Sequence, residues 1–253
     1  MASAWAARKQ VTYFVLLVIV VLVAGFFIWR SVVSRPTCSD GIENQGEEGI
    51  DCGGPCPNKC LGQVEDLIVL WTRFFETAPG KYDLVALVKN PNLSLDIPSL
   101  KYYFEIRDKN NILIATTTEE QTFINPGETF PIFEANVAFA SSTPGKIFIK
   151  LEKNPNWERN GKQKPPLVVS REQFFNTPPF PRLEVTMENK SVSDVTDISL
   201  AAVLYDKDQN AVGASLTAVD KISANSSAEA VFTWPSPFPQ EPSSTEIFFR
   251  TSL

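Results

Sequence analysis

The chain has 253 residues and a net charge of −6, with acidic and basic residues interspersed. It therefore lacks the basic stripe with which proteins neutralise nucleic-acid phosphates, and we expect no nucleic-acid partner. The sequence contains no histidine, which excludes Ser-His-Asp and Cys-His catalysis and histidine metal sites within this polypeptide.

A long apolar run without a charged residue, Val11–Trp29, stands near the start of the chain. Nineteen residues at about 1.5 Å of rise form a helix of roughly 28 Å, close to the thickness of a bilayer's hydrocarbon core. We predict a transmembrane helix over residues 11–29, which contacts membrane lipid, and a cytoplasmic tail over residues 1–10. The alternative is a signal peptide cleaved near Val23-Ala24-Gly25, but the run exceeds the usual length of a signal peptide's apolar region.

The orientation of this span is indicated mainly by the residues that lie after it. Arg8 and Lys9 precede the run, and Arg30 and Arg35 follow it, so the positive-inside rule gives only a small bias. Most of the chain and all of its cysteines come after the run. We therefore expect a single-pass protein of the cell membrane with a cytoplasmic N-terminus and extracytoplasmic C-terminal domains.

A cysteine-rich and acid-rich segment occupies residues 37–60. It holds all four cysteines of the chain: Cys38, Cys52, Cys56 and Cys60. In an oxidising space, an even number of clustered cysteines predicts disulfides, here two, with three pairings open. A four-cysteine zinc site is the alternative, although the spacing does not form the usual two pairs of ligands.

The same segment carries oxygen ligands suited to a hard cation. Calcium takes six to eight oxygens from carboxylates, amides and carbonyls on a tightly turned loop. Our candidate calcium ligands are Asp40, Asn44, Glu47 and Asp51, and we expect no other cofactor. The alternative is a solvated acidic spacer that binds no metal.

The segment also resembles the short D-G-x-x-N-x-x-E-x-G-x-D-C-G-G-x-C motif of bacterial surface proteins, which is akin to the aspartate-rich calcium repeats of thrombospondin type. The residues that carry the resemblance are Asp40, Gly41, Asn44, Glu47, Gly49, Asp51, Cys52, Gly53, Gly54 and Cys56. The resemblance covers about 20 residues and implies a surface module that calcium could stabilise.

The remainder of the chain is an internal duplication. Ile68–Asn90 matches Val168–Asn189, and within these stretches Phe74-Phe75 aligns with Phe174-Phe175. The offset between matching positions stays close to 100 residues, which indicates two copies of one domain rather than a solenoid. We place the two domains at residues 65–155 and 166–253.

Each copy shows the period-two alternation of β-strands. In Leu100–Arg107, for example, alternate residues are apolar, and turn-forming Asn, Asp, Pro and Gly separate such stretches. About seven short strands in about 90 residues predict an antiparallel β-sandwich, so the fold class is mainly β. We expect residues 154–164 to form the linker or a long loop, with Trp157 packing onto the first domain.

Two stretches resemble the F-x-L-Y-D signature of immunoglobulin-like domains associated with the cell envelope. Phe104–Asp108 keeps the Phe and Asp of this signature, and Ala202–Asp206 keeps its Leu-Tyr-Asp. Pro126-Gly127-Glu128 matches the family's Pro-Gly-Glu turn, whereas the second copy has Ala224-Asn225-Ser226 there. The resemblance implies a tandem immunoglobulin-like fold and an envelope location, and no catalytic residue.

These features predict a non-enzymatic interaction or structural protein that displays two domains on a disulfide-stapled stalk. Its partners would be proteins or surface polymers, and a proline-edged junction would limit how the domains swing. One alternative is calcium-dependent surface adhesion. Another is a glycan hydrolase that uses only carboxylates, which would require two converging buried carboxylates in one concave pocket. We expect the Phe pairs to serve packing, and Asp108 and Asp206 to close hairpins.

Overall fold

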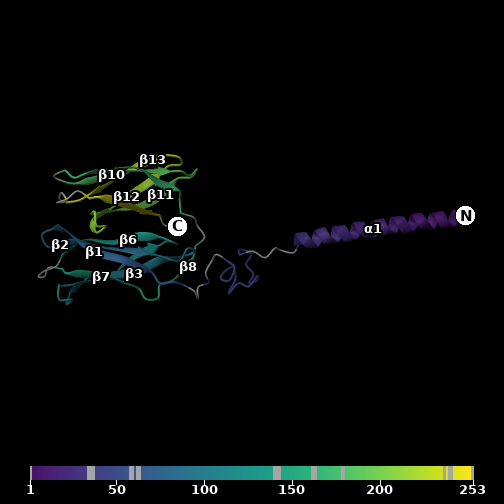
Figure 1. Ribbon diagram of the computed structural model, residues 1–253, viewed down its shortest axis with the longest axis horizontal. Helices are drawn as coiled ribbons and strands as arrows, with labels where there is room; N and C mark the ends of the chain where they lie inside the picture. The colour runs from purple at the N-terminus through teal and green to yellow at the C-terminus, as the bar shows by residue number, and fades with distance from the viewer. Residues whose placement is uncertain are drawn as a thin grey trace. The chain divides into compact units, whose positions relative to one another are not determined.

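The computed structural model describes residues 2–32, 38–56, 60, 64–138, 144–160, 164–177, 180–235, 238 and 242–251. The chain divides into two compact units, Met1–Cys60 and Leu61–Leu253. The described residues form one helix and fourteen strands, so the prediction of a mainly β protein with antiparallel sheets is confirmed (Figure 1).

The helix of the first unit, α1, spans Ala2–Val32 and contains the whole apolar run. The large apolar side chains described between Val11 and Phe26 are exposed. Among the described residues, no helix combines the length and the apolar character that crossing a membrane requires.

The second unit begins with a sandwich of two antiparallel sheets. Its strands are β1 Ile68–Ala78, β2 Lys81–Lys89, β3 Leu95–Arg107, β4 Leu113–Thr116, β5 Glu120–Ile124, β6 Thr129–Ala138, β7 Lys146–Leu151 and β8 Glu158–Arg159. One sheet has the order β1-β2-β6. The other is built around β3, which pairs with β4, β5, β7 and β8.

The second sandwich repeats this plan. Its strands are β9 Leu167–Phe175, β10 Arg182–Asn189, β11 Val195–Tyr205, β12 Ala211–Ile222, β13 Ser227–Thr233 and β14 Ser244–Arg250. The sheets have the orders β13-β10-β9 and β12-β11-β14. This copy has six described strands and the first has eight: β12 runs continuously where residues 117–119 separate β4 from β5, and no described strand of the second copy corresponds to β8.

Each sandwich has its own apolar core, formed by alternate residues of its strands. Phe104 and Ile106 are fully buried in the first core, and Leu200 and Leu204 in the second. Phe74 packs against the first core and Phe174 against the second, which confirms that these residues serve packing. Trp157 also packs against the first core, as predicted.

The two sandwiches share a third buried cluster, which we call the seam. It is formed by Val85, Leu87 and Phe130 of the first domain and Ala201, Val203, Ala214 and Phe248 of the second. In Figure 1 the β1-β2-β6 sheet accordingly faces the β12-β11-β14 sheet. A swing of one sandwich against the other would expose this apolar surface to water, so the seam opposes such motion.

The end of β14 reinforces the seam. The Arg250 guanidinium lies 4.0 Å from the centre of the Phe130 ring and 4.3 Å from that of Phe123. It also donates to the Phe123 carbonyl at 2.7 Å, and the Asn125 amide donates to the Thr251 carbonyl at 3.0 Å. Leu61–Leu253 is thus one body with three apolar clusters.

Candidate functional site

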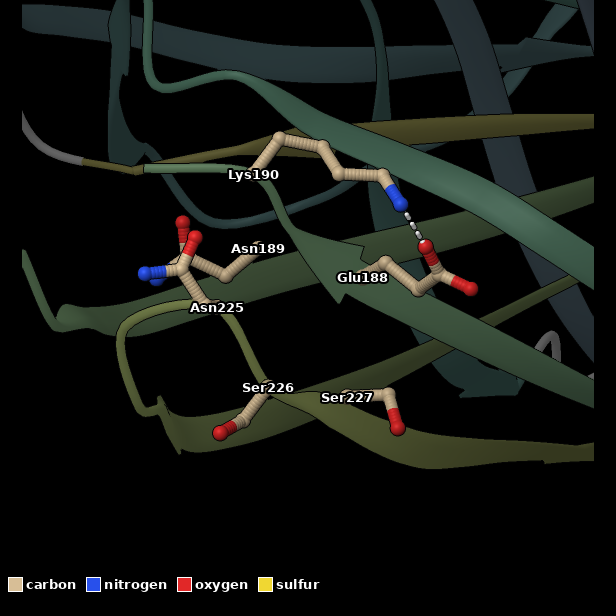
Figure 2. A pocket seen from close by; sticks show the side chains of 6 residues that line it. All are labelled: Glu188, Asn189, Lys190, Asn225, Ser226 and Ser227. Carbon is tan, nitrogen blue, oxygen red and sulfur yellow. Dashed lines mark hydrogen bonds and ion pairs between the residues drawn. The ribbon is translucent and has the colours of Figure 1, made fainter. Parts of the chain in front are cut away.

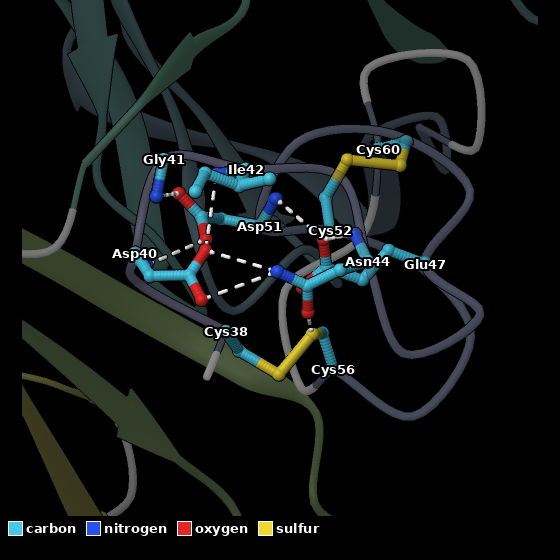
Figure 3. Close-up of a disulfide and its surroundings, with 10 residues drawn as sticks. All are labelled: Cys38, Asp40, Gly41, Ile42, Asn44, Glu47, Asp51, Cys52, Cys56 and Cys60. Atoms are coloured by element: carbon cyan, nitrogen blue, oxygen red, sulfur yellow. Dashed lines mark hydrogen bonds between the residues drawn. A yellow bond between two sulfur atoms is a disulfide. The ribbon is translucent and has the colours of Figure 1, made fainter. Parts of the chain in front are cut away.

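The cysteine segment is held by two disulfides, Cys38–Cys56 and Cys52–Cys60 (Figure 3). The prediction of two disulfides is confirmed, and one of the three pairings is selected. Because both pairs are oxidised, no thiolate is left for the alternative zinc site. A Cβ at Gly49 would lie 3.1 Å from the Cys52 sulfur, so a side chain at this position would press on the bridge.

Two of the predicted calcium ligands, Asp40 and Asp51, accept hydrogen bonds from the backbone. The Asp51 carboxylate accepts from the amides of Asp40 and Gly41, both at 2.9 Å, and Asp40 accepts from the Ile42 amide at 3.0 Å (Figure 3). These bonds join the start of the segment to a residue eleven positions later. The carboxylates therefore act as local braces of the loop.

Glu47 is the buried acid of the segment, only 8% exposed. One carboxylate oxygen accepts from the amides of Asn44 and Asp51 at 3.2 Å, and the other lies 3.0 Å from the Cys56 sulfur. A disulfide sulfur carries no proton, so this last approach is a packing contact. The sulfurs of Cys38 and Cys56 and an oxygen of Glu47 lie within 4.8 Å of one another, but the sulfurs are already bonded to each other.

The four candidate ligands thus share one network whose acid oxygens face backbone amides. One oxygen in it has no partner: Asn44 Oδ1 is buried without a hydrogen bond, while the Nδ2 of the same side chain donates to Asp40 at 3.2 Å. Among the described residues of the segment, this amide oxygen is the buried side-chain oxygen that has no hydrogen-bond partner.

The two domains repeat a buried asparagine that the sequence interpretation did not single out as structural. Asn90 donates to the carbonyls of Leu95 and Asn125, and Asn189 donates to those of Ser193 and Ile222. Each amide therefore ties two loops to the end of one strand. The sequence feature that could have indicated this role is the Asn that both copies carry at the end of the duplicated stretch.

Asp108 and Asp206 close equivalent hairpins, as predicted. Each carboxylate accepts from the backbone amides two and four residues further on, at 2.8–2.9 Å. The backbone amide of Asn210 is the main cause that lowers the pKa of Asp206. Both aspartates are committed to the turns that they form.

Glu128, of the Pro-Gly-Glu turn, is a buried carboxylate beside the seam. It is 5% exposed, and its carboxylate accepts a hydrogen bond from the backbone N–H of Asn125 at 2.9 Å. Burial raises the pKa of Glu128, and this amide and the charge of Arg250 partly oppose the shift. Burial also lowers the pKa of Arg250, an effect that the Glu128 charge opposes. The sequence placed Glu128 in a turn but carried no indication that Arg250 approaches it.

The corresponding turn of the second copy borders a polar recess of 410 Å³ (Figure 2). Its lining residues are Glu188, Asn189, Lys190, Asn225, Ser226 and Ser227. Lys190 forms an ion pair with Glu188, and Ser226 stands where the first copy has Glu128. Among the described residues that line this recess, one carboxylate paired with a lysine and two hydroxyls provide no activated nucleophile or base.

A second recess, of 240 Å³, does contain two carboxylates. It lies beside Leu67, Leu151 and Trp157 and includes Asp66 and Glu152. Both acids are exposed. They therefore lack the enclosed setting, shielded from water, in which a glycosidase holds its catalytic carboxyl groups.

No family model matches this chain, and no curated protein matches it.

Proposed function

We propose that this chain is a non-enzymatic, single-pass membrane protein that presents two immunoglobulin-like domains of the F-x-L-Y-D type outside the cytoplasm. Residues 11–29 would be its anchor, and the disulfide-bonded segment its stalk. Its partners would be proteins or surface polymers. The observation that carries the proposal is a fully paired set of four cysteines placed shortly after an uncharged apolar run.

The disulfides support an extracytoplasmic location for the residues after α1. Disulfides persist in oxidising compartments, and the cytosol keeps thiols reduced. The exposed apolar side chains from Val11 to Phe26 support an anchor, since insertion into lipid would remove this apolar surface from water. A run of this composition favours insertion by several kcal/mol.

The sandwich pair supports a role in presentation. Its carboxylates Asp108, Asp206 and Glu128 are occupied by hydrogen bonds within turns, so they shape loops and do not form a reactive centre. The seam holds the loops of both domains in fixed positions. Loops on a rigid scaffold are the usual places where β-sandwich proteins bind partners.

The test is membrane retention and protease protection of the full chain with a tag at each end. We expect the wild type to resist alkaline extraction, with the C-terminal tag digested by external protease and the N-terminal tag protected. The double variant Leu17→Arg/Val21→Arg should lose retention. Each arginine changes the insertion free energy by about 3–4 kcal/mol, or about 6–8 kcal/mol together.

The matched control places the same two charges on exposed loops of the sandwiches. Leu93 and Val192 are 82% and 87% exposed, so Leu93→Arg/Val192→Arg should be retained and protected like the wild type. Release of the wild type by alkali, or equal retention of both double variants, would refute the anchor.

Calcium-dependent adhesion is a second candidate, favoured by the unpartnered Asn44 oxygen in a network of carboxylates. In this function, calcium would bind among Asp40, Asn44, Glu47 and Asp51 and stiffen the stalk. Titration calorimetry with calcium should then give heat that Asp40→Asn removes and Glu43→Gln retains, because Glu43 lies outside the network. Equal proteolysis of the stalk with calcium and with chelator would argue against this function.

A further inference from the structure

A recess of 360 Å³ lies on the flank of the first sandwich, where β1 and β7 approach each other. It is lined by Thr72, Arg73 and Phe74 of β1, by Lys146, Ile147 and Phe148 of β7, and by Gly145. We propose that this recess binds an extended peptide segment of a partner protein in which acidic and aliphatic residues alternate.

The charges of the recess point to an anionic ligand. Arg73 and Lys146 are its two charged residues, although the whole chain carries a net charge of −6. Neither forms an ion pair with a described residue; the Arg73 guanidinium donates to the neighbouring Thr72 carbonyl at 3.0 Å. Two exposed cations are therefore available to carboxylates of a ligand.

The remaining lining is mostly apolar. Phe148 is 40% exposed, and the Arg107 guanidinium lies 5.7 Å from the centre of its ring. Phe74 and Ile147 belong to the wall that borders the core. Aliphatic side chains next to acidic ones would cover this surface while the carboxylates reach Arg73 and Lys146.

The hydrogen-bonding groups favour a peptide over a sugar. The hydroxyl of Thr72 already donates to the Ile147 carbonyl at 2.8 Å, which leaves the recess fewer groups to bond the many hydroxyls of a sugar. This bond also shows that a backbone group on the outer side of β7 faces the recess. Among the described strands, β7 pairs in a ladder only with β3, and on its other side the Ile147 carbonyl accepts a hydrogen bond from Thr72 of β1.

The position of the recess is fixed by tight packing at its end. A Cβ at Gly145 would lie 2.6 Å from the Asp108 carbonyl carbon, and the Gly145 amide donates to the Arg107 carbonyl at 2.8 Å. The hairpin that contains Asp108 therefore supports the start of β7. Lys146 is presented from a well-braced strand end.

This inference rests on the proposed interaction role but not on the anchor. It is tested with the full chain in detergent micelles and a fluorescent peptide of sequence Glu-Ile-Glu-Ile-Glu, by anisotropy. We expect saturable binding that weakens as salt is raised. The Gln-Ile-Gln-Ile-Gln peptide should bind at least tenfold more weakly, as should the Glu peptide to Arg73→Gln/Lys146→Gln.

The matched control is Lys81→Gln/Lys207→Gln, which removes the same charge from exposed positions outside the recess. It should bind within twofold of the wild type. Phe148→Ser keeps both cations and should also weaken binding, and thermal unfolding of each variant verifies that it is folded.

Three outcomes would overturn the proposal: no binding to the wild type, equal loss in both charge variants, or unchanged binding by Phe148→Ser. Tighter binding of polygalacturonate than of the peptide would assign the recess to acidic sugars instead. Failure of peptide binding together with normal protease protection would leave the membrane-anchored function standing.

Discussion

Removing the Phe130 ring should destabilise both sandwiches together. Phe130 is 2% exposed within the seam, and the Arg250 guanidinium of the second domain lies against its ring. Replacing a buried Phe by Ala costs about 3–5 kcal/mol, from lost burial and the cavity left behind. We therefore expect Phe130→Ala to lower the free energy of unfolding by about 4 kcal/mol, nearly three decades in the equilibrium constant.

Native-state hydrogen exchange can show where this loss is felt. The most protected amides of β3 report on the first domain, and those of β11 report on the second. If the seam makes the pair one cooperative unit, both sets exchange through the same global opening, and Phe130→Ala lowers both opening free energies by the same amount.

The control is Phe148→Ala, which removes a ring of the same size from a position that is 40% exposed on the opposite sheet of the first domain. Its effect should stay near or below about 1 kcal/mol. Loss of protection in β3 alone, with β11 unchanged, would show that Phe130 serves only its own domain and would refute the coupling.

Three further predictions concern buried groups and the stalk. Burial raises the pKa of Glu128 in the folded state above its unfolded value, so ionisation of Glu128 opposes folding. Lowering the pH from 7 towards 4.5 should therefore raise the free energy of unfolding of the wild type relative to that of Glu128→Gln, as measured in urea. A relative stability that falls as the pH is lowered would contradict this. Asn189→Ala leaves the Ser193 and Ile222 carbonyls without their donor and should cost about 3 kcal/mol, whereas Asn154→Ala, at an exposed position, should be nearly neutral. Dithiothreitol should raise amide exchange in residues 38–56 and leave the β-sheet circular dichroism unchanged, because all four cysteines lie in the stalk; loss of the sheet signal would contradict this.

Much of the fold of each domain could be predicted from alternation and turns. Leu100–Arg107 lies within β3, whose apolar side chains enter the core, and the aspartates after β3 and β11 form the expected hairpins. These features depend on residues close in sequence, which is where pattern and turn chemistry are informative. The strand number was less accurate, because the continuity of β12 depends on its pairing with β11.

The seam was missed although the sequence carries a signal for it. Residues 84–88 read LVALV, an unbroken apolar run, whereas the matching residues 183–187 read LEVTM. An unbroken run indicates a strand buried on both faces. Applied to residues 200–204, LAAVL, the same reasoning identifies the second face of the seam, but only the structure shows that these two strands meet.

The stalk was predicted in composition but not in detail. Clustered cysteines and acids indicated disulfides and a turned loop, yet spacing alone could not select a pairing. The spacing also could not show that Asp40 and Asp51 accept hydrogen bonds from backbone amides, because these bonds depend on how the loop closes. The peptide recess brings β1 together with β7, about 70 residues later, and no local pattern reports such a juxtaposition.

The seam is also a head-to-tail contact between equivalent domains, and such contacts can propagate without limit into fibres. Here the sheets that correspond to the two faces of the seam carry polar side chains instead. The sheet of the second domain that matches the first half of the seam presents Glu184 and Thr186 in place of Val85 and Leu87. The sheet of the first domain that matches the other half presents Glu105 in place of Val203. Polar side chains at these positions disfavour a repeat of the same contact with a further copy of either domain.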